Sequence, residues 1–400
     1  MQNICLVACV KSKLETKAKA EELYTSALFK KTKSYAQRNC DKWYILSAKY
    51  GLLETNTEIA PYEVTLNNMS AIERKKWAKS VSNDLLKRIT EKSKITFLAG
   101  EKYREHLIPI LKKEGHEISI PMKGLPIGGQ LSWLNDQNTK PKPSKDLNRF
   151  YSLMKELKEG LGGYRYLHEC NGKMNWPRRG VYFIFEEGEH RAIEKNVNRV
   201  VRVGTHAVSK NAKSTFWNRL ITHRGTEGGR GNHRGSIFRL HIGNSLQKKA
   251  PNKYNAITWG NGQTAPKEIR ENEKSLEEAV STVVGRMKIL WLAVNDTPSS
   301  NSDRSYIEKN CIGLLTAVSP PLDPPNKNWL GCYSTRERIK KSGLWNLDYY
   351  QFKYDPSFLE ILERYVKSTI GISCPITKSI APKNWKQKKR KNPYKQMLLF

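Results

Sequence analysis

The sequence of 400 residues lacks both a long apolar run and closely spaced cysteines. Its longest apolar run, residues 289–294, is far shorter than the roughly 20 residues that cross a membrane, which excludes a spanning helix. The seven cysteines form no CxxC pair, which excludes a zinc knuckle and favours a reducing, cytoplasmic compartment in which thiols stay free. No basic residue precedes the first apolar stretch, so we expect a buried strand there and not a signal peptide.

Acidic residues are also scarce relative to basic ones. The chain has 38 Asp and Glu against 70 Lys and Arg, a formal net charge of +32. A field of this sign attracts polyanions, and a basic excess is the common mark of nucleic-acid-binding proteins. Contact with a ribosome or a membrane surface, or solubility alone, would explain the same charge. The charge therefore favours nucleic acid as the partner without proving it.

The first part of the chain, residues 1–135, alternates between apolar, β-rich runs and helical patterns. Ser70 followed by Glu73 is a capping-box signature at the start of one helix. This alternation predicts an α/β domain with a mostly parallel sheet. The expected strands cover residues 4–10, 43–48, 95–99 and 117–120, and the expected helices cover 26–38, 70–89 and 101–113.

Three further segments are expected after this domain. Residues 136–175 should form a linker and a bridging helix, because residues 135–149 are polar and contain two prolines. Residues 176–374 should form a second domain of short strands and helices with a C-terminal extension, in which residues 236–242 are an expected strand. Residues 375–400 should be a basic, flexible tail, since they cannot bury enough apolar surface to fold alone.

Four motifs occur in a set order in the second domain. They are Gly180-Val181-Tyr182, then Arg202-Val203-Gly204, then Arg219 and His223 on one helix face, and finally Glu308 in the run Ile-Glu-Lys-Asn-Cys-Ile. This order resembles the GIY-YIG nuclease family, including the UvrC-type excision nucleases. The resemblance implies an α+β domain that acts as an endonuclease on double-stranded DNA.

The resemblance also implies a role for each of these residues. Tyr182 would orient or deprotonate the attacking water, with His223 as its hydrogen-bond partner or as the base itself. Arg219 would hold the scissile phosphate with its planar guanidinium group. Glu308 would bind one Mg²⁺ (or Mn²⁺) ion that neutralises the developing charge. Taken singly, the tyrosine would be ordinary packing, and Arg219 and His223 an ordinary solvated helix face.

One position departs from the family pattern. The second motif normally begins with tyrosine, and this chain has Arg202 there. Arg202 would contact phosphate instead, and His206, just after the motif, is a candidate for proton transfer. The departure also keeps open a non-catalytic DNA-binding protein with a degenerate nuclease fold.

A loop rich in glycine and arginine, residues 224–235, follows the helix that carries Arg219. Glycine lets the backbone approach a ligand closely and arginine binds phosphate, so this loop is expected to contact DNA. The alternative is a solvent-exposed connection. The expected DNA-contacting residues are His206, Arg224, Arg230, His233, Arg234 and Asn310.

Polar residues follow three expected strands of the first domain, the position at which open α/β sheets bind ligands. The run Leu-Ser-Ala-Lys-Tyr-Gly-Leu-Leu followed by Pro61-Tyr62 resembles the YaaA-like domains, which bind DNA. The resemblance implies recognition of a modified base, and N-glycosidic cleavage of that base (a DNA glycosylase activity) is a further alternative. These side chains would otherwise only tie turns together. The expected pocket residues are Lys11, Ser12, Ser47, Lys49, Tyr50, Tyr62 and Glu101.

The chain ends in Gln396-Met397-Leu398-Leu399-Phe400. This resembles the pentapeptide by which bacterial repair proteins dock on the sliding clamp, with Gln396, Leu399 and Phe400 as its key residues. Apolar side chains at the end of a flexible basic segment would fit a hydrophobic groove on a partner protein. The alternative is a terminus that packs on its own domain.

Together these patterns predict a cytoplasmic, nucleoid-associated and Mg²⁺-dependent DNA endonuclease. Its expected role is restriction or anti-phage defence, with the first domain recognising a modified base. A clamp-guided repair nuclease and a non-catalytic DNA-binding protein are the alternatives. A homodimer would suit a double-strand cut by two single-site domains.

Overall fold

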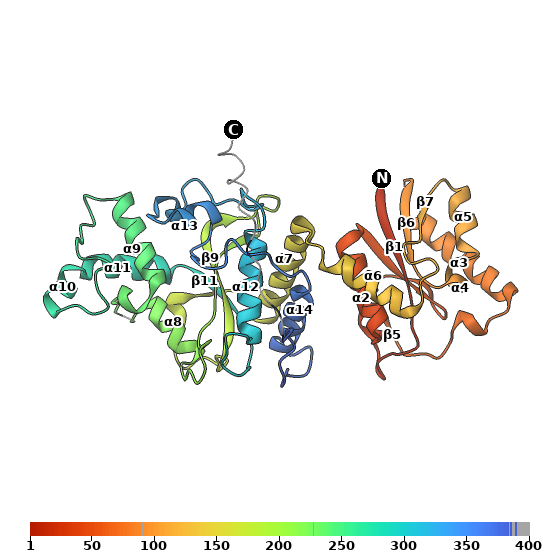
Figure 1. The fold of residues 1–400 in the computed structure, drawn as a ribbon, viewed down its shortest axis with the longest axis horizontal. Coiled ribbons are helices and arrows are strands. Elements are labelled where there is room, and N and C mark those ends of the chain that lie inside the picture. Colours follow the sequence, from red (N-terminus) through yellow and green to blue (C-terminus); the bar gives the residue numbers. More distant parts are fainter. Residues whose placement is uncertain (90, 227, 384, 386–388, 390–400) are drawn as a thin grey trace. The chain divides into compact units, whose positions relative to one another are not determined.

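The computed structural model consists of two compact units, Met1–Lys142 and Pro143–Phe400 (Figure 1). It describes residues 1–89, 91–226, 228–383, 385 and 389. Among these residues, no helix is both long enough and apolar enough to cross a lipid bilayer.

The first unit is an α/β domain, which confirms the fold class expected from its strand–helix alternation. Its sheet has the order β4-β3-β1-β6-β7, in which β4 pairs antiparallel with β3 and the other pairs are parallel. The strands are β1 (Gln2–Ala8), β3 (Lys42–Ser47), β4 (Gly51–Leu53), β6 (Ser93–Leu98) and β7 (Glu117–Ser119), with a separate ribbon of β2 (Ala18–Lys19) and β5 (Glu58–Ile59). The helices are α1 (Ala20–Leu23), α2 (Ala27–Asn39), α3 (Ala71–Arg88), α4 (Glu101–Arg104), α5 (Leu107–Lys113), α6 (Ile127–Thr139) and the 3-10 turn η1 (Leu66–Asn68).

Local signals explain where the elements of this unit begin. The capping box at α3 is confirmed: Glu73 N donates to Ser70 Oγ at 3.3 Å and Ser70 N donates to Glu73 Oε2 at 2.7 Å. The strand β1 is buried on both faces, with Ile4 and Leu6 in one core and Cys5 and Val7 in another, so it is continuously apolar from Ile4 onward. The helix expected over residues 101–113 is broken at His106, which lies between α4 and α5.

The second unit is α+β, as expected, with an antiparallel sheet of order β10-β9-β11-β8. The strands are β8 (Arg165–Tyr166), β9 (Gly180–His190), β10 (Asn198–Gly204) and β11 (Lys288–Ala293). The helices are α7 (Pro143–Gly160), α8 (Phe216–Arg224), α9 (Ile237–Lys249), α10 (Lys267–Asn272), α11 (Lys274–Gly285), α12 (Asp303–Leu315), α13 (Glu337–Ser342) and α14 (Phe358–Thr369), with 3-10 turns η2 (Leu167–Glu169), η3 (His233–Gly235) and η4 (Leu330–Tyr333).

Alternate residues of β9 enter two separate cores. Val181 and Phe183 pack in a core with α7, α12 and α14. Tyr182 and Ile184 pack on the opposite face in a core with α8, α9 and α11. Figure 1 shows these two sets of helices on opposite sides of the sheet. A one-residue shift of β9 would exchange the two sets, so the register of this strand determines where Tyr182 lies.

Two expected elements differ from the structure. Residues 236–242 are not a strand but the start of α9, whose N-cap Ser236 accepts a hydrogen bond from Arg239 N at 3.3 Å. Apolar residues alternate there with Arg239 and His241, a pattern typical of a strand, but both polar side chains are buried in the fold, and Arg239 binds Glu277 of α11. The segment 135–149 is largely helical and not an open linker, because α7 begins at Pro143, a position in a helix that proline tolerates.

The segment after residue 374 also differs from the expected flexible tail. Ile376, Ile380, Ala381 and Trp385 are partly buried against the core of the second unit. The clamp-docking residues Gln396, Leu399 and Phe400 lie outside the described residues.

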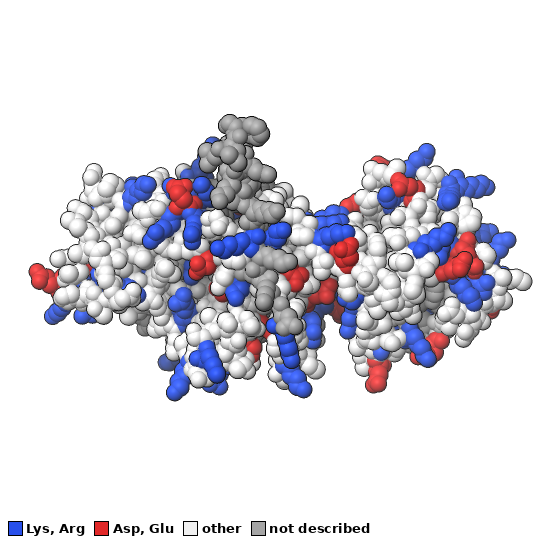
Figure 2. Space-filling view, in the orientation of Figure 1, with Lys and Arg blue, Asp and Glu red and all other residues white. Residues whose placement is uncertain are grey.

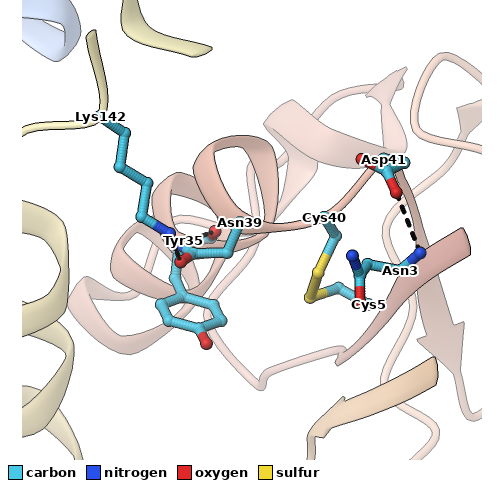
Figure 3. The surroundings of a disulfide bond; sticks show 7 residues. All are labelled: Asn3, Cys5, Tyr35, Asn39, Cys40, Asp41 and Lys142. Carbon is cyan, nitrogen blue, oxygen red and sulfur yellow. Dashed lines mark hydrogen bonds between the residues drawn. A yellow bond between two sulfur atoms is a disulfide. The ribbon is translucent and has the colours of Figure 1, made fainter. Parts of the chain in front are cut away.

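A disulfide joins Cys5 of β1 to Cys40, the residue that follows α2 (Figure 3). The two are 35 residues apart in sequence, and their Cα atoms lie 5.9 Å apart. The neighbouring Asp41 accepts a hydrogen bond from Asn3 N at 3.0 Å, which helps hold the end of α2 against β1. The expectation of free thiols was therefore wrong for this pair, because the fold and not the spacing brings the two cysteines together. The other five cysteines are free.

Candidate active site

Tyr182 of β9 and His223 of α8 form a buried, hydrogen-bonded pair. Tyr182 Oη lies 2.8 Å from His223 Nε2, and His223 Nδ1 lies 2.7 Å from the hydroxyl of Ser236. Burial, followed by the charges of Arg219 and Arg202, holds the pKa of His223 well below its usual value, so the ring is neutral. A neutral imidazole donates through one nitrogen and accepts through the other, and His223 therefore connects the phenol to the Ser236 hydroxyl.

The glycines of the first two motifs make room for this tyrosine. Tyr182 pairs with Gly204 across β9 and β10. A Cβ atom at Gly204 would lie 2.2 Å from Tyr182 Oη, and one at Gly180 would lie 2.2 Å from the carbonyl oxygen of Leu292. Any larger residue at these two positions would displace the tyrosine or part the strands.

Glu308 reaches the same region from α12. Its carboxylate faces Arg202, Arg219 and the backbone N–H of Thr205, and all three favour the charged form. Burial outweighs them and raises the pKa of Glu308 to about 7. When it is ionised, the carboxylate offers oxygen atoms of the kind that bind Mg²⁺. The residues that the structure describes hold no cluster of three His, Cys, Asp or Glu side chains. Glu308 would thus bind a metal as a single protein ligand, with water and phosphate in the other positions.

The two arginines of the motifs have different surroundings. Arg202 is buried, donates from Nη1 to the carbonyl oxygen of Trp345 at 3.0 Å and lies over the Phe238 ring at 4.7 Å. Arg219 is only half-buried, and its Nε finds no hydrogen-bond partner among the described residues. The Nε of Arg202 also lacks a partner among the described residues, but Arg202 is buried and held by Trp345, whereas the half-buried Arg219 can reach a ligand with its donor.

Sequence analysis missed two arginines beside this site. Arg304 is fully buried, donates from Nε to Asp296 Oδ1 at 2.5 Å and also binds the carbonyl oxygens of His206 and Ala207. Arg179 donates to the carbonyl oxygen of Asp296 at 2.8 Å, and burial, followed by the charges of Arg178 and Arg304, lowers its pKa. Arg178 and Arg179 directly precede the first motif, so their position in the sequence is the signal that would have identified them.

His206 lies among these arginines. It is buried, and although the backbone of Arg178 lies close enough to favour the protonated ring, neither ring nitrogen forms a hydrogen bond of acceptable geometry within the described part of the chain. Burial, followed by the charge of Arg304, lowers its pKa to about 4, so the ring is neutral. The neutral ring keeps one donor and one acceptor nitrogen beside these arginines.

Most expected DNA contacts from the loop at 224–235 are already occupied within the protein. Arg224 is buried and donates to the carbonyl oxygen of Cys170 at 2.6 Å. His233 lies 2.9 Å from Glu277 and stacks on Trp259, and Arg234 binds Glu273 with two hydrogen bonds of 2.6 and 2.9 Å. Arg230 is exposed. Of these four residues it is the one best placed to meet DNA.

The side chain of Asn310, on α12, is likewise already hydrogen-bonded within the protein. Its amide donates to the carbonyl oxygen of Tyr306 at 2.8 Å, and its side-chain oxygen accepts from Asp355 N at 2.7 Å. The side chain thus ties α12 to the segment before α14.

In the first unit, three expected pocket residues form one network. The Ser47 hydroxyl donates to Tyr62 Oη at 2.7 Å and accepts from Tyr50 N at 3.0 Å. Tyr62 Oη lies 2.8 Å from Tyr24 Oη, and burial raises the pKa of both phenols. This network holds the turn after β3 in place. That is what we expect if these side chains have a structural role and do not bind a ligand. Lys11, Ser12 and Lys49 are exposed.

A cavity of about 690 Å³ opens beside this network, at the carboxyl ends of β1 and β6. The chain order reverses between these two strands, and open α/β sheets bind ligands at that point. Glu101, Tyr103 and Arg104 line the cavity, and Tyr103 Oη lies 3.1 Å from the thiol of Cys9. The Nε atom of Arg104 is buried without a hydrogen-bond partner among the described residues. Of the expected residues only Glu101 lines this cavity.

Comparisons with known proteins agree with this division. Residues 4–136 match a family of unknown function (DUF6884). The uncharacterized protein YfjM of Bacillus subtilis (strain 168) is 29% identical over 149 residues, which cover 34% of this chain and 94% of that protein. No solved structure matches the chain. Residues 142–371, more than half of the chain, match the model of the GIY-YIG domain, which supports a phosphodiester-cleaving nuclease with DNA as its substrate. The chain therefore belongs to the GIY-YIG family.

Proposed function

We propose that the second unit is a Mg²⁺- or Mn²⁺-dependent DNA endonuclease that uses Tyr182, His223, Arg219 and Glu308. The observation that carries this proposal is that Arg202 and Arg219 lie close enough for their charges to act on both His223 and Glu308. The tyrosine–histidine pair and the carboxylate thus share one site, although they come from three different elements. Basic side chains also predominate over acidic ones on the visible face (Figure 2), as a DNA-binding surface requires.

Each residue would then have a separate task. With His223 Nε2 as the acceptor of this hydrogen bond, the Tyr182 phenol would pass its proton to His223 as its oxygen takes a proton from the attacking water. Arg219 offers its free donor to the scissile phosphate. A metal held by Glu308 would neutralise charge on the phosphate and the leaving oxygen. Arg202, in the place of the usual tyrosine, keeps Glu308 closer to its ionised form.

The cleavage rate should depend on pH through Glu308. Only the ionised carboxylate binds metal, so at low Mg²⁺ the rate should fall about tenfold for each pH unit below 7 and level off above it. Protons and metal compete for the same carboxylate, so more Mg²⁺ should move the midpoint to lower pH. His223 stays neutral and should add no inflection near its usual pKa. Single-turnover cleavage rates, measured across pH at two Mg²⁺ concentrations, give the two midpoints. If the midpoint is the same at both concentrations, Glu308 is not the metal ligand.

We further propose that the first unit recognises a modified base, and that the protein restricts foreign DNA in the cytoplasm. The cavity at the ends of β1 and β6 supports this proposal, because it combines apolar walls with the free donor of Arg104. A base presented to such a pocket must first leave the duplex stack.

Cleavage should accordingly be faster on duplexes that carry a modified base than on the same unmodified sequence. Arg104→Ala should remove this preference and leave the basal rate unchanged, because it alters the pocket and not the nuclease site. Lys87→Ala removes an exposed charge from the same unit and should retain the preference. Equal rates on duplexes with unmodified, methylated and glucosylated bases would contradict the restriction role but not the nuclease itself. Free base released before strand scission would support the glycosylase version.

A further inference from the structure

Beyond residue 371, where the family match ends, the chain folds back onto α12. We name residues 376–383 together with Trp385 the C-terminal strap. Asp303, the first residue of α12, is fully buried and accepts hydrogen bonds from Ile380 N at 2.8 Å, from Ala381 N at 3.3 Å and from the Ser379 hydroxyl. Tyr365 of α14 donates to the same carboxylate at 2.6 Å. One buried carboxylate thus fastens the strap to the helix that carries Glu308.

Aromatic packing provides a second attachment. The ring of Trp385 meets the ring of Tyr306 edge to face, with centroids 4.9 Å apart. Tyr306 is itself fixed, because its hydroxyl donates to Asp355 Oδ2 at 2.9 Å. Trp385 remains half-buried, so part of the indole stays available to a ligand.

The strap and α12 enclose a cavity of about 270 Å³. Its lining combines two aromatic rings, two lysines, an amide and a hydroxyl, and no described residue of the lining carries a carboxylate. These side chains belong to Tyr306, Trp385, Lys309, Lys383, Asn301 and Ser300. Lys309 follows Glu308 in the chain, and the two side chains interact electrostatically. The cavity therefore adjoins the proposed active site.

We propose that this cavity is a subsite for the DNA strand that flanks the scissile phosphate. Lys309 and Lys383 would hold a backbone phosphate, and the exposed part of the Trp385 indole would pack on the neighbouring base. Aromatic side chains beside lysines bind single nucleotides without sequence preference, because every base has a π face and every nucleotide a phosphate. This proposal rests on the nuclease function of the second unit, and it places part of the DNA-binding surface outside the region of the family match.

DNA binding by the full-length protein tests the subsite. Fluorescence anisotropy with a labelled duplex that ends in a single-stranded extension, whose bases can stack on the indole, gives Kd without divalent metal over a range of salt concentrations. Trp385→Ala should weaken binding about tenfold through the lost stacking. Lys383→Ala, on an exposed side chain, should reduce the slope of log K against log salt by about 0.9, the value for one phosphate contact.

Lys378→Ala is the matched control, since it removes the same charge from an exposed position of the strap that does not line the cavity. It should leave both Kd and the salt slope unchanged. The subsite is refuted if Lys383→Ala and Trp385→Ala bind as wild type does, or if Lys378→Ala loses as much affinity as Lys383→Ala. Absence of cleavage by wild-type protein with Mg²⁺ would refute the nuclease proposal instead, and the binding titration would still decide the subsite.

Discussion

Replacing Glu308 by glutamine should reduce DNA cleavage by about 10³-fold or more while DNA binding stays near the wild-type level. Glutamine keeps the size of the side chain and loses the charge that would hold the metal. Burial already disfavours the ionised carboxylate, as its pKa of about 7 shows. The neutral amide removes this cost, so the melting temperature at alkaline pH should not fall. The variant would thus lose activity without losing stability.

Single-turnover cleavage, anisotropy and thermal unfolding of the same preparation measure these three effects. Glu187→Gln is the matched control, because Glu187 is an exposed carboxylate of β9 outside the site. It should cut at the wild-type rate. If Glu308→Gln cuts as well as wild type, Glu308 is not the metal ligand. If neither wild type nor variant cuts any duplex but both bind, the non-catalytic alternative that Arg202 raised becomes the better description.

Tyr182→Phe should lower the cleavage rate by about 10²- to 10⁴-fold, the usual contribution of a positioned acid–base group. The substitution removes the only oxygen of the side chain and leaves the ring in its place. It also leaves the buried His223 Nε2 without its partner, which should cost about 1–3 kcal/mol of the free energy of unfolding. A control is therefore needed that loses a similar free energy of unfolding but keeps the cleavage site intact.

Tyr151→Phe makes this separation possible. The hydroxyl of Tyr151 is also buried and accepts a hydrogen bond from Val200 N at 3.0 Å, but Tyr151 packs on the opposite face of the sheet from Tyr182. The control should be destabilised by a similar amount in urea unfolding and still cut at the wild-type rate. Equal rate losses in the two variants would mean that Tyr182 supports the fold and not the reaction.

Local patterns were sufficient for much of the fold. The capping box at Ser70 and the apolar run of β1 each depend on residues close together in the chain, and both have their expected structures. Residues 236–242 were misassigned because burial of Arg239 depends on Glu277 of α11, which lies distant in sequence. The disulfide between Cys5 and Cys40 was not predicted either, because the fold brings together two cysteines that lie 35 residues apart in the chain.

The order of the motifs by itself determined the family, because residue types at set positions are a property of the sequence. Only the tertiary structure decided which candidate side chains are free to act. Arg234 and Asn310 look available in the sequence, yet Glu273 and Asp355 already occupy them. The carboxylate of Glu308, the pair of Tyr182 and His223, and the strap on Asp303 come together through strand register and helix packing. Such contacts join residues far apart in the chain, and no local pattern records them.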